Sequence, residues 1–307
     1  MISVPSSPAL ALIAALPPQL EALVEPLIEP LQFAFLQRAL GLGVLVAVVC
    51  AVLSCFMILK GWALMGDAVS HAVLPGVVIA YALGLPFAVG AFVFGVGAVG
   101  AIGFIKQHSR VKEDSVIGLV FTGFFAFGLV LLSKWRSSVD LQHILFGNLL
   151  GVADSDIQQS LLISGLVLLV LALRGRDLLL FCFDPIHARS IGLRTGLLHY
   201  LLLTLLSLAA VAGLQSVGII LVVAMLVTPG ATGYLLSDRF GPMIAWAVLS
   251  AVLATVLGLA ASYWLDASTA GCIVVVQTLQ FLLVLVLAPR HGLLAQHFSL
   301  LAQRRPR

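Results

Sequence analysis

Residues 40–59 read LGLGVLVAVVCAVLSCFMIL, a run that contains no Lys, Arg, Asp, Glu or Pro. Roughly 20 helical residues cross the hydrocarbon core of a bilayer, so this run has the length of a membrane span. Backbone groups in lipid must be paired within their own segment, which makes each such span a helix. The pattern recurs along the chain and predicts nine spans. They lie near residues 38–59, 63–84, 86–106, 115–133, 158–180, 196–213, 216–236, 241–263 and 269–288.

The composition supports the same fold class. Of the 307 residues, 61% are apolar and 9% are charged. In soluble chains, roughly a quarter of the residues are charged. A transmembrane barrel would show alternating segments of about ten residues, which these runs do not. We therefore predict an all-α, polytopic transmembrane bundle. The span at 63–84 contains several polar residues, so eight spans are the alternative count.

The positive charges give the bundle an orientation, because Lys and Arg are enriched in cytoplasmic connections. If the carboxyl terminus is cytoplasmic, the inner side holds thirteen of them and the outer side holds three. The inner residues are Lys60, Lys106, Arg110, Lys112, Arg174, Arg176, Arg189, Arg194, Arg239, Arg290, Arg304, Arg305 and Arg307, and the outer ones are Arg38, Lys134 and Arg136. The chain then divides into an outer proline-rich, amphipathic segment at 1–32, a membrane domain at 33–295 and a cytoplasmic tail at 296–307.

One stretch places ionisable residues inside a predicted span, where they are costly and usually functional. Asp67 and His71 are four residues apart and Ser70 is three from Asp67, so all three share one helix face. A carboxylate oxygen and an imidazole nitrogen suit Mn²⁺, Fe²⁺ or Zn²⁺. Two ligands are too few for a complete site, so water, carbonyls freed near Pro75 and Gly76, or a second subunit would supply the others. A structural ion pair between Asp67 and His71 is the alternative.

A second polar stretch, FDPIHARSIGLR, occupies residues 183–194 on the predicted inner side. Asp184 is a typical N-cap, Pro185 a typical first helical residue and Gly192 a typical terminator. The sequence thus predicts a short cytoplasmic helix. A helix this short is unstable alone, so it indicates either a docking partner or an ordinary capped connection.

The remaining features indicate packing rather than chemistry. Pro229 and Gly230, like Pro75 and Gly76, permit a kink and close contact between helices. None of the four cysteines belongs to a C-x-x-C pair, so we interpret them as core residues. Only His71 lies well within a span, which argues against a haem, and no Walker A lysine pattern is present.

Five segments, in order, resemble the membrane permease subunit of the ABC importers for manganese, iron and zinc. They are LMGDAVSHAVLPG at 64–76, DLQHILFGNLLGV at 140–152, FDPIHARSIGL at 183–193, VGIILVVAMLVTPGATGYLL at 217–236 and STAGCIVVVQTLQFLLVLVLAPRHGLL at 268–294. The resemblance covers roughly residues 33–295, and the sequence of residues 140–152 favours the manganese and iron branch of the family. It implies a multi-pass protein of the bacterial plasma (inner) membrane that moves a metal ion by alternating access.

The resemblance also implies residue roles and partners. Asp67 and His71, with Ser70 beside them, match the metal-contacting pair of the family. Residues 183–193, with Asp184, Pro185, Ala188, Arg189 and Gly192, match the helix that docks on the ATPase. The implied partners are two cytoplasmic ATPase subunits, an extracytoplasmic metal-binding protein and a second permease subunit, identical or not. No permanently bound cofactor and no nucleic acid are expected, and Gly230 stands where the family leads us to expect Ala.

Three alternatives remain open at this stage. A zinc importer of the same family would use the same residue types. A channel or secondary transporter would need no ATPase. A membrane-embedded metalloenzyme would need a fuller ligand set such as H-E-x-x-H, which the sequence lacks.

Overall fold

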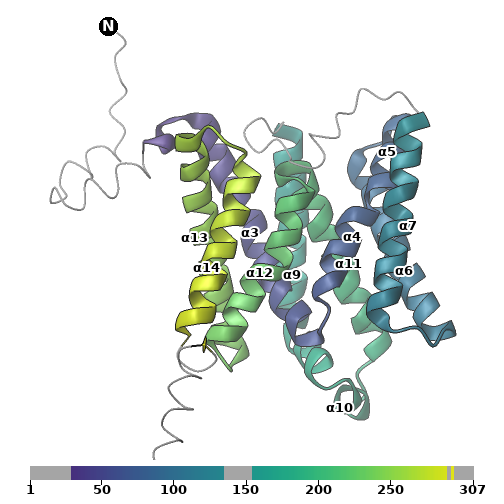
Figure 1. Cartoon of the computed structure of the whole chain (residues 1–307). Helices are drawn as coiled ribbons and strands as arrows, with labels where there is room; N and C mark the ends of the chain where they lie inside the picture. Colours follow the sequence, from purple (N-terminus) through teal and green to yellow (C-terminus); the bar gives the residue numbers. More distant parts are fainter. Residues whose placement is uncertain (1–28, 135–153, 289–291, 294–307) are drawn as a thin grey trace, which may run out of the picture.

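The computed structural model describes residues 29–134, 154–288 and 292–293. Within them all regular structure is helical (Figure 1). The elements are η1 (Pro30–Gln32), α3 (Ala34–Lys60), α4 (Ala63–Ala72), α5 (Leu74–Ala82), α6 (Phe87–His108), α7 (Glu113–Lys134), α9 (Asp154–Phe183), α10 (Pro185–Ser190), α11 (Thr195–Val217), α12 (Ile219–Leu236), α13 (Phe240–Leu265) and α14 (Thr269–Leu287). Residues 1–28, the segment 140–152 and the predicted tail at 296–307 lie outside the described residues.

The predicted fold class is confirmed. Eight helical segments of the described chain are long and apolar enough to cross a membrane, with α4 and α5 counted together as one. The long helix α9 packs against α3 and α11 and runs along the same bundle (Figure 1). It therefore occupies the place of the span expected at 158–180.

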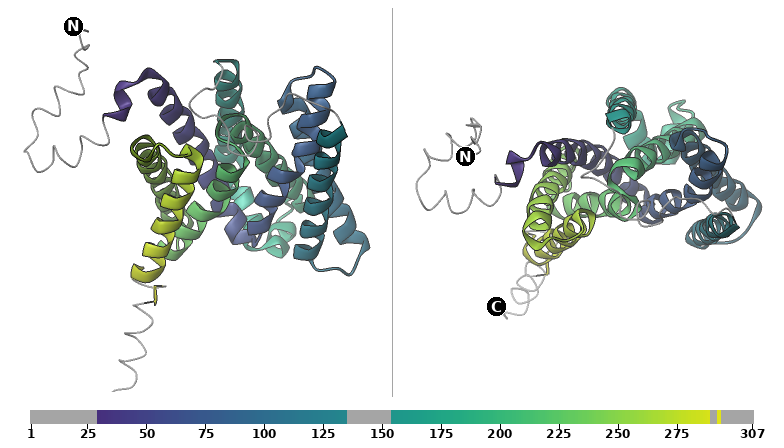
Figure 2. Two further views of the ribbon diagram at one scale, coloured as in Figure 1. Left: turned by 45° about the horizontal axis from the view of Figure 1, so that its top comes forward. Right: turned by 90° about the horizontal axis from the view of Figure 1, so that it is seen from above.

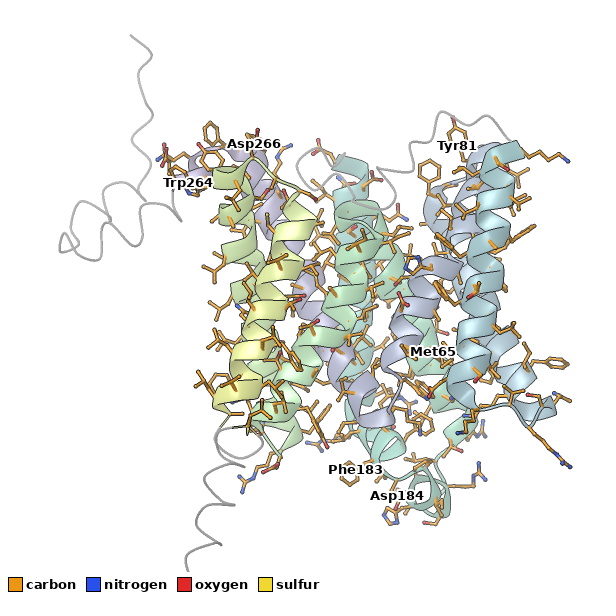
Figure 3. The ribbon with its side chains drawn as sticks, in the orientation of Figure 1. Met65, Tyr81, Phe183, Asp184, Trp264 and Asp266 are labelled. Atoms are coloured by element: carbon orange, nitrogen blue, oxygen red, sulfur yellow. The ribbon has the colours of Figure 1, made fainter. Side chains whose placement is uncertain are left out.

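The two ends of the bundle carry different charges. Figure 3 places Tyr81, Trp264 and Asp266 at one end and Phe183 and Asp184 at the other. The turn after α3, the turn between α6 and α7, and α10 share the second end (Figure 1), which thereby receives Lys60 and Arg189. Of the Lys and Arg residues that we predict to lie on the cytoplasmic side, all those that the structure describes lie towards this end. Arg38 and Lys134 lie at the opposite end.

The helices form two groups, and α11 lies between them. One group consists of α3, α12, α13 and α14, and the other of α4, α5, α6 and α7. Between them, α11 contacts α3, α4, α6, α9 and α12 (Figure 2). Small residues allow close helix contact in a membrane. A Cβ atom on Gly258 of α13, for example, would lie 2.5 Å from the Cα atom of Ile273 on α14.

The span expected at 63–84 is divided at Val73 into α4 and α5. Pro75 lies in the first turn of α5 and has no N–H, so the His71 carbonyl lacks the usual donor four residues ahead. The Val73 amide donates to this carbonyl instead. A second break lies at Gly218, whose φ of 85° separates α11 from α12. The four cysteines are free and all but Cys272 are buried, as expected of core residues.

Candidate metal site and cytoplasmic docking helix

Asp67 and His71 lie one turn apart on α4. The Nε2 atom of His71 is 3.3 Å from Oδ1 of Asp67. Two ligands of one cation, each at about 2.0–2.2 Å from it, are separated by roughly 3.0–3.4 Å. The Asp67 side chain is 37% exposed and that of His71 is 21% exposed. The pair therefore has the spacing and the access of two adjacent ligands, although the same distance also describes an ion pair.

Two phenylalanines of α7 hold the His71 ring. Its centroid is 5.1 Å from that of Phe121 and 5.3 Å from that of Phe125, edge to face in both cases. The Nδ1 atom is buried and has no hydrogen-bond partner among the described residues. A metal-binding histidine usually donates this second N–H to an acceptor, which makes it a stronger ligand. The phenyl rings offer no such acceptor, so a metal ion bound by His71 would be held less firmly.

Sequence reasoning did not find these two phenylalanines. They belong to the run FTGFFAF at 121–127, where their spacing of four residues puts them on one helix face. That spacing is the only feature of the sequence that points to these two residues. The sequence does not show that α7 packs on α4, which the structure does.

Ser70 is turned towards its own helix. Its hydroxyl donates to the Gly66 carbonyl at 2.8 Å, and the residue is buried. Its predicted contact with a metal stays a prediction. Across the part of the chain that the structure describes, no group of three or more His, Cys, Asp or Glu side chains could hold a metal ion. A metal ion at Asp67 and His71 would thus need further ligands from water, backbone carbonyls or another chain.

The segment around Pro229 and Gly230 packs against α3. The Ser54 hydroxyl donates to the Val227 carbonyl at 3.1 Å and accepts from the Gly230 amide at 2.9 Å. A Cβ atom on Gly230 would lie 2.6 Å from the carbonyl carbon of Ser54. This contact gives a physical reason for Gly where Ala was expected.

Two further glycine contacts lie around Asp67 and His71. Gly76 of α5 faces Gly90 of α6, and a Cβ atom on Gly76 would lie 2.6 Å from the Gly90 carbonyl carbon. A Cβ atom on Gly66, the residue before Asp67, would lie 3.2 Å from Cβ of Leu226 on α12. Helix α12 therefore packs closely against α4 just before Asp67, and α6 packs closely against α5 just after His71.

The predicted short helix at 183–193 is α10. Oδ1 of Asp184 accepts from the Ile186 amide at 3.0 Å and from the His187 amide at 2.9 Å, as an N-cap does. Pro185 occupies the first turn, and Gly192 ends the segment with a φ of 89°. Ala188 is fully buried, and an Arg189 guanidinium nitrogen lies 3.3 Å from Oγ1 of Thr195 on α11.

Apolar side chains are exposed around α10. Phe183 is 78% exposed and Ile186 is 83% exposed, and Ile191 is also exposed. Helix α10 projects beyond the ends of its neighbours, as Figures 1 and 3 show. Exposed apolar residues gathered on a projecting element mark a surface that contacts either another protein or the membrane.

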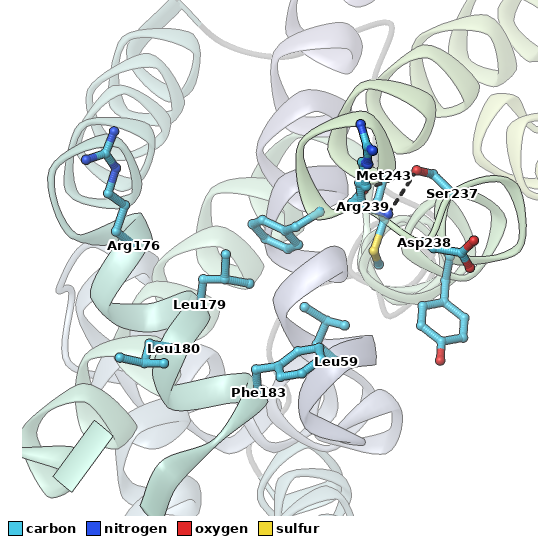
Figure 4. Close-up of a pocket in the computed structure, with 11 residues that line it drawn as sticks. Leu59, Arg176, Leu179, Leu180, Phe183, Ser237, Asp238, Arg239 and Met243 are labelled. Carbon is cyan, nitrogen blue, oxygen red and sulfur yellow. Dashed lines mark hydrogen bonds between the residues drawn. The ribbon is translucent and has the colours of Figure 1, made fainter. Parts of the chain in front are cut away.

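A cleft of about 540 Å³ borders the last turns of α9, which precede α10 (Figure 4). Its walls are Leu59 of α3, Leu179, Leu180 and Phe183 of α9, and Phe240 and Met243 of α13. Arg176, Tyr234, Ser237, Asp238 and Arg239 complete the lining. No residue of α4 borders it, so this cleft is distinct from the Asp67–His71 pair.

A helical membrane bundle with a carboxylate–imidazole pair inside a span and a short projecting helix is the architecture expected of a membrane transport protein. Residues 32–288 match the ABC 3 transport family, and the chain belongs to this family. The resemblance inferred from the sequence segments is confirmed.

Relatives of known name narrow the assignment. The chain is 59% identical over 272 residues to the manganese transport system membrane protein MntB of Synechocystis, with 89% of each chain covered. It is 51% identical to the chelated iron transport system membrane protein YfeD of Yersinia pestis, over 84% of this chain and 87% of that one.

Solved structures show the same fold. The structure of PsaBC from Streptococcus pneumoniae in complex with Fab matches with a TM-score of 0.81 and 40% identity, over 90% of this chain and 99% of that one. An inward-facing putative metal-chelate type ABC transporter matches with a TM-score of 0.61 at 17% identity, over 95% of this chain and 91% of that one, and this likeness concerns the fold alone.

Proposed function

We propose that this chain is the transmembrane permease of an ATP-driven importer that carries Mn²⁺ or Fe²⁺ into the cytoplasm. The observation that carries the proposal is the Asp67–His71 pair at 3.3 Å on α4, in a chain whose relatives are named for manganese and chelated-iron transport. The metal is the transported substrate. No permanently bound cofactor is part of the proposal.

The donor set supports a borderline divalent cation. One carboxylate oxygen and one imidazole nitrogen suit Mn²⁺, Fe²⁺ and Zn²⁺, whereas a thiolate would favour softer, tighter binding. The buried cysteines lie on other helices than Asp67 and His71. The names of the relatives favour manganese and iron over zinc, which makes the zinc importer the alternative within the family.

The structure of α10 supports the proposal that the chain has an ATPase partner. Its backbone is fixed by the Asp184 cap and by Gly192, so its exposed apolar residues are presented rigidly. We assign it as the element on which a cytoplasmic ATPase subunit docks, with Asp184, Pro185, Ala188, Arg189 and Gly192 maintaining its shape. An extracytoplasmic metal-binding protein would deliver the ion at the opposite end of the bundle.

The charge distribution supports the orientation. The end that carries α10 also holds most of the Lys and Arg residues, so it lies on the cytoplasmic side of the bacterial inner membrane. Residues 1–32 are then extracytoplasmic, residues 33–295 form the membrane domain and residues 296–307 are a cytoplasmic tail.

The proposed mechanism is alternating access. An ion from the outer side would bind between Asp67 and His71, completed by water or by a second permease subunit, identical or not. ATPase closure would displace α10 and change the packing of α4 against α7 and α12. The His71 imidazole, held by phenyl rings instead of a hydrogen-bond acceptor, would then release the ion readily.

Metal-dependent ATP hydrolysis in a reconstituted complex tests this function. The permease, its ATPase and its binding protein are placed in proteoliposomes, and hydrolysis and uptake are measured with Mn²⁺, Fe²⁺ and Zn²⁺ in turn. We expect uptake of Mn²⁺ or Fe²⁺ only when ATP is hydrolysed. Uptake by the permease alone would identify a channel or secondary transporter instead, and stimulation by Zn²⁺ alone would identify the zinc importer.

A further inference from the structure

A cluster of cationic and aromatic side chains lies at the end of the bundle that carries α10. Its members are Lys60 of α3, Trp62 at the start of α4, Phe181 of α9 and His199 of α11. Nζ of Lys60 lies 4.2 Å from the Phe181 ring centroid and 5.8 Å from that of Trp62. The Trp62 and His199 centroids are 4.9 Å apart with the rings at 87°. Phe181 lies 6.4 Å from His199, again edge to face.

This cluster connects the elements next to α10 with the helix of the metal pair. Phe181 is three residues before Asp184, the cap of α10. His199 is one turn after Thr195, to which Arg189 is hydrogen-bonded. Trp62 is the N-cap of α4, and its carbonyl accepts from the Met65 amide at 3.0 Å. Asp67 follows five residues later on the same helix.

The contacts are close and shielded from solvent. Trp62 and Phe181 are each 4% exposed. The Lys60 ammonium donates to the Phe181 carbonyl at 3.4 Å, and its charge is attracted to aromatic faces. Close-packed side chains transmit a displacement because they change between discrete arrangements instead of deforming continuously.

The order of packing leads from α10 to α4 through this cluster. Helix α10 packs on α9 and α11, and α11 in turn packs on α4. His199 and Trp62 form an edge contact where α11 meets the start of α4. A movement of α10 that carried the nearby ends of α9 and α11 with it would therefore push on the indole ring at the beginning of α4.

We propose that Trp62, which contacts His199 and Lys60, is the positioning residue that transmits the movement of α10 to Asp67 and His71. This inference rests on the proposed function, since it requires an ATPase on α10 and a metal on α4. Trp62 is neither a member of the Asp67–His71 pair nor a residue of α10. Its loss should uncouple hydrolysis from uptake while both binding steps remain.

The test uses the full reconstituted complex and the Trp62→Leu variant. Four quantities are measured: ATPase co-purification, Mn²⁺ binding, ATP hydrolysis and Mn²⁺ uptake. We expect normal co-purification and binding, with uptake per ATP reduced within the roughly 5–150-fold range of typical coupling between sites. Trp62→Phe retains an aromatic edge and should restore much of the coupling.

Phe56→Leu is the matched control. Phe56 of α3 makes a similar edge contact with Phe240 of α13, at 5.0 Å and 66°. Neither residue lies on α4, α9, α10 or α11. It should lose stability without losing coupling. The inference is overturned if Trp62→Leu and Phe56→Leu give the same uptake per ATP.

A second variant tests the same contact in case the Trp62→Leu protein does not assemble. His199→Leu removes the same contact from the side of α11. If both variants lose assembly or metal binding in proportion to uptake, the cluster is only structural and the inference is wrong. If the wild-type complex itself shows no metal-dependent hydrolysis, the proposed function fails before any variant is compared.

Discussion

The Ser54 hydroxyl on α3 accepts a hydrogen bond of 2.9 Å from the backbone amide of Gly230 on α12. The same oxygen donates to the Val227 carbonyl at 3.1 Å. One small polar side chain thus joins two helices beside Pro229, where a proline interrupts the regular ladder of backbone hydrogen bonds. The contact requires a glycine, because the backbone of Ser54 occupies the space of a Cβ atom.

We therefore expect Gly230→Ala to destabilise the protein by about 1–3 kcal/mol, the usual cost of adding a methyl group to a packed core. Thermal unfolding in detergent measures the change. Gly100→Ala on α6 is the control, because a Cβ atom there meets nothing within 4 Å. Equal melting temperatures for the two variants would contradict the contact.

Removing either member of the metal pair should abolish uptake. Asp67→Ala and His71→Ala each delete a proposed ligand, so Mn²⁺ affinity should fall by more than the roughly 10–100-fold that loss of a supporting partner costs. Equilibrium binding of Mn²⁺ to the detergent-solubilised complex measures this, with size-exclusion chromatography to show that assembly is intact.

Ser70→Ala distinguishes a ligand from a neighbour. The Ser70 hydroxyl proton is engaged by the Gly66 carbonyl, so we expect a smaller loss of Mn²⁺ binding than for Asp67→Ala. A loss as large as that of the pair would make Ser70 a ligand. Normal uptake by both Asp67→Ala and His71→Ala would show instead that the pair is a structural ion pair.

The phenyl rings around His71 should tune how tightly the ion is held. Phe125→Asn would place an acceptor beside the His71 ring, whose Nδ1 atom now has none among the described residues. We expect Mn²⁺ to bind about 10–100-fold more tightly and to be transported more slowly, since release would limit the cycle. Phe125→Leu removes the ring without adding an acceptor, and tighter binding in this control would refute the explanation.

The surface of α10 should govern ATPase association. Ile186→Asp places a charge on an 83% exposed apolar residue, and we expect the ATPase to bind about tenfold or more weakly, as when an interface anchor is lost. Pull-down of the ATPase with the tagged permease measures this, and Ile186→Leu should behave as wild type.

The conformation of α10 can be tested separately from its surface. Gly192→Ala forces a side chain into a left-handed backbone conformation, with φ at 89°, at a cost of roughly 1–2 kcal/mol. We expect weaker ATPase stimulation than in wild type. Unchanged stimulation in both Gly192→Ala and Ile186→Asp would mean that α10 is an ordinary connection.

Local sequence determined the elements of this protein. The apolar run at 40–59 requires a helix because a backbone in lipid must pair with itself. Asp184, Pro185 and Gly192 specify the beginning and end of α10 through contacts within a few residues. The spacing of Asp67 and His71 places them on one face for the same reason, since helix periodicity acts over one turn.

The tertiary structure alone decided which side chains from distant segments meet. Phe121 and Phe125 lie against His71, Ser54 lies against Gly230, and Trp62 lies against His199. Helices in a bilayer associate through shape and small residues, without the burial pattern that marks a soluble core. An apolar run therefore predicts a span, but the partners of that span depend on the packing of the whole bundle.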